Sequence, residues 1–358
     1  MSKKLKKFED IRVVVGLDFG TTFSGFTYCH VEDRQNMSTN ETWPGQLGQF
    51  KTNTVLEYDD DLDKVVLWGY PALTKRPSRN KEKNKRKNVV ELFKLHLGNL
   101  SPKLRNELSV DYKKAITDYL GEIGKCVEET IDVRWKGMKL ENVLFILTVP
   151  AEYDDKAIRI MRECMSDAKL IDDLYSERLQ FTTEPEAAAI YCMENNLKEH
   201  DLTDSGTTFM IVDCGGGTVD LTTRKLLNRK QLGEVTERTG DYCGNAFRDH
   251  VDNISVPQSP TAAISRGAAM YGLSLYNGED PSIRKGSKSV IGSRVLKNTY
   301  GVDVLRPWSP GDPKERVGLS FFGPSTLYFN IIAKRGTVAK IDDVFPTEGL
   351  TNLVMNLE

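Results

Sequence analysis

Two short segments of the sequence place an aspartate, glycines and threonine in the same order at the end of an apolar strand pattern. The first reads VVVGLDFGTT over residues 13–22, and the second reads FMIVDCGGGTVD over residues 209–220. Glycines allow backbone N–H groups to approach phosphate oxygens closely, as in other anion-binding turns. An aspartate at the strand end offers an oxygen ligand to magnesium or to its waters, and the threonine adds a hydroxyl. Two such turns facing each other predict a site for a polyphosphate and its metal ion.

The residues around both turns predict strand–turn–strand units. In each copy a glycine stands two residues after the aspartate, threonine follows, and alternating apolar residues resume over 23–28 and 219–226. A Walker-type loop would need Gly-Lys-Ser/Thr at the start of a helix, and a dinucleotide fingerprint would need GxGxxG there; neither is present. One copy alone is typical of an ordinary hairpin, so the repetition is what favours a ligand site.

Between the two turns the sequence predicts the order helix, strand, helix. Apolar residues at spacings of three and four predict an amphipathic helix within 111–135, and NVLFILTV over 142–149 predicts a buried strand. A second helix follows over 154–168, with Asp154 or Asp155 as its cap.

A second strand and helix end this stretch and place four residues at strand ends. We expect a short strand over 178–182 and a helix through Met193 with Pro185 in its first turn. Asp18, Pro150, Glu184 and Asp213 then all follow predicted strands. Ligands of open α/β sheets bind beyond the carboxyl ends of strands, so one cleft is expected to collect these four residues.

Composition excludes several classes of protein. The 358 residues are 39% hydrophobic with a formal net charge of −2, which gives no general attraction to nucleic acid or anionic membrane. The N-terminal residues lack the apolar stretch of a secretory signal, and the apolar runs are only of strand length. We therefore expect a cytoplasmic protein with neither nucleic acid nor membrane as a partner.

Two further features are interpreted conservatively. Six cysteines show no CxxC spacing, which favours reduced thiols over a zinc site. The basic run over residues 75–87 is interpreted as a solvated loop, with a nuclear-import role left open.

Four segments carry a resemblance to a known family. LDFGTT, TVPAEY, TEPEAAAIY and DCGGGTVD, in this order, resemble the ATPase domain of the heat shock protein 70 family, within the superfamily of actin, sugar kinases and chaperones. SRGAAMYGL over 265–273 and RVLKNTYGV over 294–302 are most similar to its divergent heat shock 70 kDa protein 12 branch. The resemblance implies an α/β fold: the duplicated actin-like ATPase (ribonuclease H-like) fold. Its parts would be a first lobe over 11–200, a second lobe over 201–275 and a partial β-rich, peptide-binding-like region over 285–358.

The resemblance also implies roles for individual residues. Asp18 and Asp213 would hold magnesium, Glu184 would orient the water that attacks ATP, and Asp213 would contribute to catalysis as well. Lys94 would contact phosphate, although an exposed surface lysine is the alternative. ATP or ADP would be cradled by the two turns and one later glycine: Gly20, Thr21, Thr22, Gly215, Gly216, Gly217, Thr218 and Gly244. Client polypeptides would be the partners.

One departure from the family limits this interpretation. The segments over 239–250 and 259–273 resemble parts of the family that are separated there by on the order of a hundred residues, whereas only the eight residues 251–258 bridge them here. The missing part would include an outer subdomain and the turn that holds adenosine.

The leading hypothesis is an ATP-binding, chaperone-related protein with slow or compromised hydrolysis. The alternatives are a truncated or degenerate paralogue that acts as a non-enzymatic interaction module and, more weakly, a sugar or metabolite kinase.

The C-terminal segment changes to short alternating patterns with Gly and Pro turns. These patterns predict strands over 294–304, 317–322 and 327–332.

Overall fold

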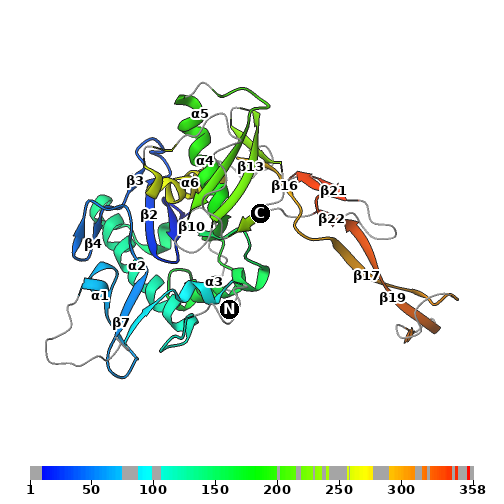
Figure 1. The fold of residues 1–358 in the computed structure, drawn as a ribbon, viewed down its shortest axis with the longest axis horizontal. Helices are drawn as coiled ribbons and strands as arrows, with labels where there is room; N and C mark the ends of the chain where they lie inside the picture. Colours follow the sequence, from blue (N-terminus) through cyan, green and yellow to red (C-terminus); the bar gives the residue numbers. More distant parts are fainter. Residues whose placement is uncertain are drawn as a thin grey trace.

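The structure is a computed structural model (Figure 1). It describes residues 10–74, 88–98, 106–199, 202–214, 219–228, 230–235, 239–241, 256–257, 259–276, 290–310, 317–320, 323–340, 343–345 and 353–354. The basic run over 75–87 lies outside these ranges.

The first sheet is built around β1 (Val13–Phe19), in the order β11-β10-β1-β2-β3. β10 (Val143–Val149) runs parallel to β1, and β11 (Leu179–Thr183) runs parallel to β10. On the other side β2 (Phe23–His30) is antiparallel to β1, and β3 (Ser38–Thr39) is antiparallel to β2. Every residue of β1 and β10 is buried, because helices cover both faces of the sheet.

One face packs against α2 (Tyr112–Arg134) and α3 (Asp155–Asp167), and the other against α4 (Glu184–Glu194) and α6 (Pro260–Leu275). The predicted helices begin where capping chemistry places them. The side chain of Asp154 caps α3, and α4 begins with a Thr183–Glu186 capping box and Pro185 in its first turn. The helices and strands predicted between residues 111 and 193 are confirmed to within a few residues.

Helix α6 packs closely against both α4 and the first sheet. A Cβ atom at Gly267 would lie 1.7 Å from the carbonyl oxygen of Ala187 in α4. A Cβ atom at Gly16 of β1 would lie 2.3 Å from the carbonyl oxygen of Ser265 in α6. The small residues of SRGAAMYGL therefore allow three backbones to approach one another.

The second sheet begins with a repeat of the β1–β2 hairpin. Its order is β12-β13-β14-β16-β20, and β15 (Thr239–Asp241) also pairs with β13. β12 (Thr208–Cys214) and β13 (Val219–Asn228) are antiparallel and place Asp213 opposite Asp220, as β1 and β2 place Asp18 opposite Gly25. Within the described ranges β12 pairs only with β13, whereas β1 has a strand on each side.

Residues after α6 complete the second sheet and then leave it. β16 (Ile291–Val295) lies parallel to β14 (Gln231–Glu234) and antiparallel to β20 (Val338–Lys340). The prediction of one strand over 294–304 is wrong: β16 ends at Val295, and β17 begins only at Tyr300. The chain bends between them because β16 belongs to the second sheet and β17 to a separate one.

That separate sheet consists of β17 (Tyr300–Pro307), β19 (Gly323–Ala333) and β18 (Val317–Ser320). β17 and β19 form a long ribbon that extends away from the α/β body (Figure 1). A short pair, β21 (Val344–Phe345) and β22 (Leu353–Val354), completes this region.

Smaller elements surround the first sheet. They are β4 (Thr42–Trp43), β5 (Gln46–Leu47), β6 (Thr52–Asn53), β7 (Val55–Tyr58), β8 (Val65–Trp68), α1 (Tyr70–Thr74), β9 (Val89–Glu91), the 3₁₀ helices η2 (Phe93–His96) and η4 (Leu140–Asn142), and α5 (Asn196–Glu199).

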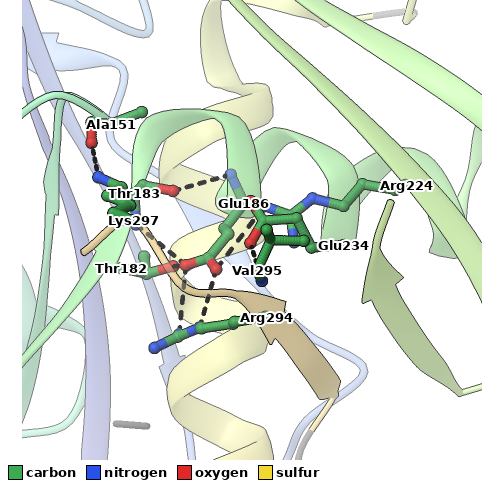
Figure 2. Close-up of polar contacts among 9 residues, drawn as sticks. All are labelled: Ala151, Thr182, Thr183, Glu186, Arg224, Glu234, Arg294, Val295 and Lys297. Carbon is green, nitrogen blue, oxygen red and sulfur yellow. Dashed lines mark hydrogen bonds and ion pairs between the residues drawn. The ribbon is translucent and has the colours of Figure 1, made fainter. Parts of the chain in front are cut away.

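A buried ionic cluster joins α4 to the second sheet (Figure 2). Glu186 of α4 lies between two arginines: the Arg294 Nε is 3.1 Å from its Oε1 atom, and the Arg224 Nη2 is 3.7 Å from the same atom. Arg224 also lies 3.5 Å from Glu234 of β14, which accepts a hydrogen bond from the backbone N–H of Val295. The cluster thus connects α4, β13, β14 and β16.

Candidate phosphate and metal site

The structure brings three acidic residues from strand ends into one site. Asp18 lies at the end of β1, Glu184 begins α4 and Asp213 lies near the end of β12. Burial raises the pKa of Asp213 to about 7, and the negative charges of Glu184 and Asp18 add to this rise. Burial likewise raises the pKa of Glu184; Lys94 opposes the rise and Asp18 adds to it. Asp213 therefore lies within electrostatic reach of Glu184 and Asp18.

Lys94 lies inside this site, and the alternative of an exposed surface lysine is wrong. Its side chain is only 3% exposed, and its Nζ is 2.7 Å from Glu184 Oε1. The same Nζ donates a hydrogen bond of 2.5 Å to the carbonyl oxygen of Phe19 and lies over the rings of Phe19 and Tyr153. The bend of the chain at Leu92, which has a φ of 59°, precedes the short helix that carries Lys94.

A second lysine in the site was not predicted from the sequence. The Lys51 Nζ is 2.6 Å from Asp18 Oδ2. Burial would lower the pKa of Lys51, but the charge and contact of Asp18 raise it overall, with Asp213 and Glu184 contributing. The sequence around Lys51 contains no motif that predicts this contact. The position of Lys51 depends on how the loop before β6 folds across β2.

The first glycine turn is supported from behind by Thr54. The Thr54 hydroxyl donates a hydrogen bond of 2.8 Å to the carbonyl oxygen of Gly20, and its backbone N–H donates to Thr22. A Cβ atom at Gly20 would lie 2.2 Å from the carbonyl oxygen of Phe23, so the turn requires glycine. Gly20, Thr21 and Thr22 are partly exposed beside Asp18, where a ligand can reach them.

The other residues predicted to bind the nucleotide belong to the second turn and to one later glycine. Gly215, Gly216, Gly217, Thr218 and Gly244 lie outside the described residues.

The acidic residues fit a magnesium ion that keeps part of its water shell. In the ranges that the structure describes, no group of three or more His, Cys, Asp or Glu side chains is arranged to hold an ion directly. Magnesium usually retains several waters and takes one or two carboxylates together with phosphate oxygens. Asp18 and Asp213 are the carboxylates that would be available to such an ion, and the carboxylates of Glu184 and Asp18 add negative charge near Asp213.

Curated proteins with similar sequences include two heat shock 70 kDa proteins and a chaperone protein. The chain is 26% identical to heat shock 70 kDa protein 12A of Mus musculus, over 66% of this chain and 44% of that protein. It is 25% identical to heat shock 70 kDa protein 12B of Homo sapiens, over 60% of this chain and 40% of that protein. The chain is therefore similar in sequence to heat shock 70 kDa proteins 12A and 12B. A bacterial relative, the chaperone protein HscA homolog of Chromobacterium violaceum, is 26% identical over 64% of this chain and 35% of its own length.

This similarity agrees with the resemblance that the four motifs carry. The chain spans less than half of the length of each of these three relatives. No protein-family model matches it.

Solved structures resemble the chain only weakly. The MamK double helical filament has a TM-score of 0.36 at 14% identity, over 64% of this chain and 54% of that one. MreB 5 of Spiroplasma citri bound to AMPPNP has a TM-score of 0.35 at 16% identity, over 89% of this chain and 72% of that one. Among the described residues, no helix has the length and apolar composition needed to cross a bilayer.

Proposed function

We propose that this protein binds ATP with magnesium between its two hairpins and hydrolyses it slowly, as a chaperone-related protein of the cytoplasm. The observation that carries the proposal is the buried Lys94–Glu184 pair, 2.7 Å apart, beside the Asp18 turn and facing Asp213. A buried lysine and carboxylates from two strand ends are the groups that phosphoryl transfer requires, because the chemistry depends on positioning and charge stabilisation.

Each residue has a distinct role in the proposed reaction. Glu184 accepts a hydrogen bond from the attacking water and orients it in line with the terminal phosphate. Lys94 is held by Glu184 and the Phe19 carbonyl, so its ammonium is fixed where negative charge develops. Asp18 and Asp213 would hold the magnesium ion, which supplies charge neutralisation at the phosphates when it is bound.

Calorimetry of the purified chain with ATP and magnesium tests the binding. We expect wild-type protein to bind and both Asp18→Ala and Asp213→Ala to lose binding, while Asp61→Asn, an exposed acid away from the site, behaves as wild type. An absence of heat with ATP, ADP and AMP-PNP at millimolar ligand would contradict the proposal.

Steady-state turnover tests the role of Glu184. The variant Glu184→Gln keeps the shape of the side chain but removes its charge, so we expect ATP binding to persist and hydrolysis to fall at least about a hundredfold. Unchanged turnover in Glu184→Gln would show that another group orients the water.

The second candidate function is a non-enzymatic interaction module. It is favoured by the second sheet, in which, among the described residues, no strand takes the place beside β12 that β10 takes beside β1, and in which Met210 and Val212 are exposed. Turnover that exceeds background and disappears in Glu184→Gln would exclude this candidate. The proposed chaperone-related role also includes binding of client polypeptides by this protein. A binding assay with unfolded polypeptides would test that part separately.

A further inference from the structure

Lys51 places a positive charge directly on the carboxylate that is expected to hold the metal ion. Its Nζ is 2.6 Å from Asp18 Oδ2, and Asp18 is only 2% exposed. The Lys51 side chain is 21% exposed, so its ammonium lies at the mouth of the site rather than in the core. Asp213 and Glu184 also act on it electrostatically.

The backbone around Gly25 explains how Lys51 reaches Asp18. In the β1–β2 register Gly25 stands directly opposite Asp18, on the same face of the sheet. A Cβ atom at Gly25 would lie 2.4 Å from the carbonyl oxygen of Phe50 and 3.0 Å from Lys51 Cγ. The absence of a side chain therefore lets the Lys51 stem cross β2 and meet the carboxylate.

The two lysines of the site differ in how they are held. Lys94 is 3% exposed and is fixed by Glu184 and by the Phe19 carbonyl. Lys51 pairs with Asp18 from a flexible four-carbon stem at the mouth of the site. Lys51 is thus the cation that can be exchanged, whereas Lys94 stays in place.

We propose that Lys51 competes with the divalent cation for Asp18, and that the ammonium displaced by the metal then binds a phosphate of the incoming nucleotide. The first half rests on the proposed role of Asp18 as a metal ligand, and the second half also rests on the proposed binding of ATP. An ammonium and a divalent metal ion repel each other when both contact the same carboxylate, and a lysine ammonium carries three donors suited to phosphate oxygens. Lys51 would then couple metal binding to nucleotide binding.

Titration with Mn²⁺ alone, in the absence of nucleotide, tests the competition. We expect Lys51→Met to bind Mn²⁺ roughly tenfold more tightly than wild type, because the carboxylate loses its resident cation. Lys51→Arg keeps the charge and should stay near the wild-type affinity. The matched control is Lys125→Met, which removes a surface lysine 2.7 Å from Glu122 and should change nothing. Mn²⁺ affinity in Lys51→Met equal to or weaker than wild type would overturn the competition.

Titration with ATP in the presence of magnesium tests the second half. We expect Lys51→Met to bind ATP several-fold more weakly than wild type while binding the metal more tightly, an opposition that general loss of structure cannot produce. Lys51→Gln repeats both measurements if Lys51→Met fails to fold. Unchanged ATP affinity would overturn the phosphate contact.

The two tests separate the inference from the proposed function. Failure of wild-type protein to bind ATP, together with the expected Mn²⁺ result, removes the proposed function and the phosphate contact but supports the exchange at Asp18. ATP binding by wild type without the Mn²⁺ difference removes the exchange and keeps the proposed function.

Discussion

The folded protein destabilises the ionised form of the Asp213 carboxylate. Its neighbours in the site include the carboxylates of Glu184 and Asp18, and burial removes much of the water that would stabilise its ionised form. Lys51 and Lys94 offset this only in part. Ionisation of Asp213 therefore lowers the free energy of unfolding. Strongly shifted pKa values of this kind are common at functional sites.

The stability of the protein should therefore depend on pH through Asp213. Its pKa rises from an ordinary value of 3.8 to about 7 on folding, so the folded state binds the proton more tightly than the unfolded state between these values. Its contribution to the free energy of unfolding is then greatest at low pH and falls as pH rises toward about 7, by a few kcal/mol.

Urea denaturation of wild type and Asp213→Asn between pH 5 and pH 8 measures this contribution. The asparagine does not titrate, so we expect the difference in unfolding free energy between the two proteins to shift in favour of Asp213→Asn as pH rises. Parallel pH profiles for the two proteins would contradict the prediction.

At the scale of elements, α6 depends on small residues where it crosses α4 and β1. Gly267 lies against the backbone of Ala187, and Gly16 lies against the backbone of α6. Backbone atoms cannot move aside as the end of a flexible side chain can, so an added methyl group must push the elements apart.

Gly267→Ala should therefore destabilise the protein although alanine favours helices. We expect a loss of about 1–3 kcal/mol, the usual cost of overpacking a core. The control is Gly121→Ala in α2, where nothing lies within 4 Å of the added Cβ and helix propensity should stabilise the protein slightly. Thermal or urea unfolding of both variants checks the prediction, and a stabilised Gly267→Ala would refute the close packing.

At the scale of the whole molecule, the ionic cluster around Glu186 joins α4, which packs on the first sheet, to strands of the second sheet (Figure 2). Arg224 is fully buried and approaches Glu186 of α4 and Glu234 of β14. Arg294 brings the strand that follows α6 to the same glutamate. Removal of one buried partner leaves charge uncompensated in the interior, which usually costs more than the pair contributes.

Arg224→Met should for this reason lower the unfolding free energy by about 3 kcal/mol or more. Lys125→Met, which breaks the 2.7 Å surface pair with Glu122, should cost less than about 1 kcal/mol because water already screens that pair. Equal losses of unfolding free energy in the two variants, measured by urea denaturation, would show that the buried cluster does not stabilise the contact between α4 and the second sheet.

Much of the first sheet and of its helices could be predicted because the signals are local. Strand alternation, the Asp and Gly residues of the first turn, and the caps of α3 and α4 depend on neighbours within a few residues. The same local order placed Asp18, Glu184 and Asp213 at strand ends, and parallel pairing of β10 with β1 and β11 carries such ends to one edge of the sheet.

The tertiary structure alone decided which residues from distant parts of the chain meet. Lys51 reaches Asp18 because Gly25 leaves room across β2, and Lys94 is buried because its short helix packs against Phe19. Helix α6 lies on the first sheet, and β16 pairs with β14 in the second. These outcomes depend on close approach of backbones and on pairing of buried charges across the fold, and such contacts leave no periodic pattern in the sequence.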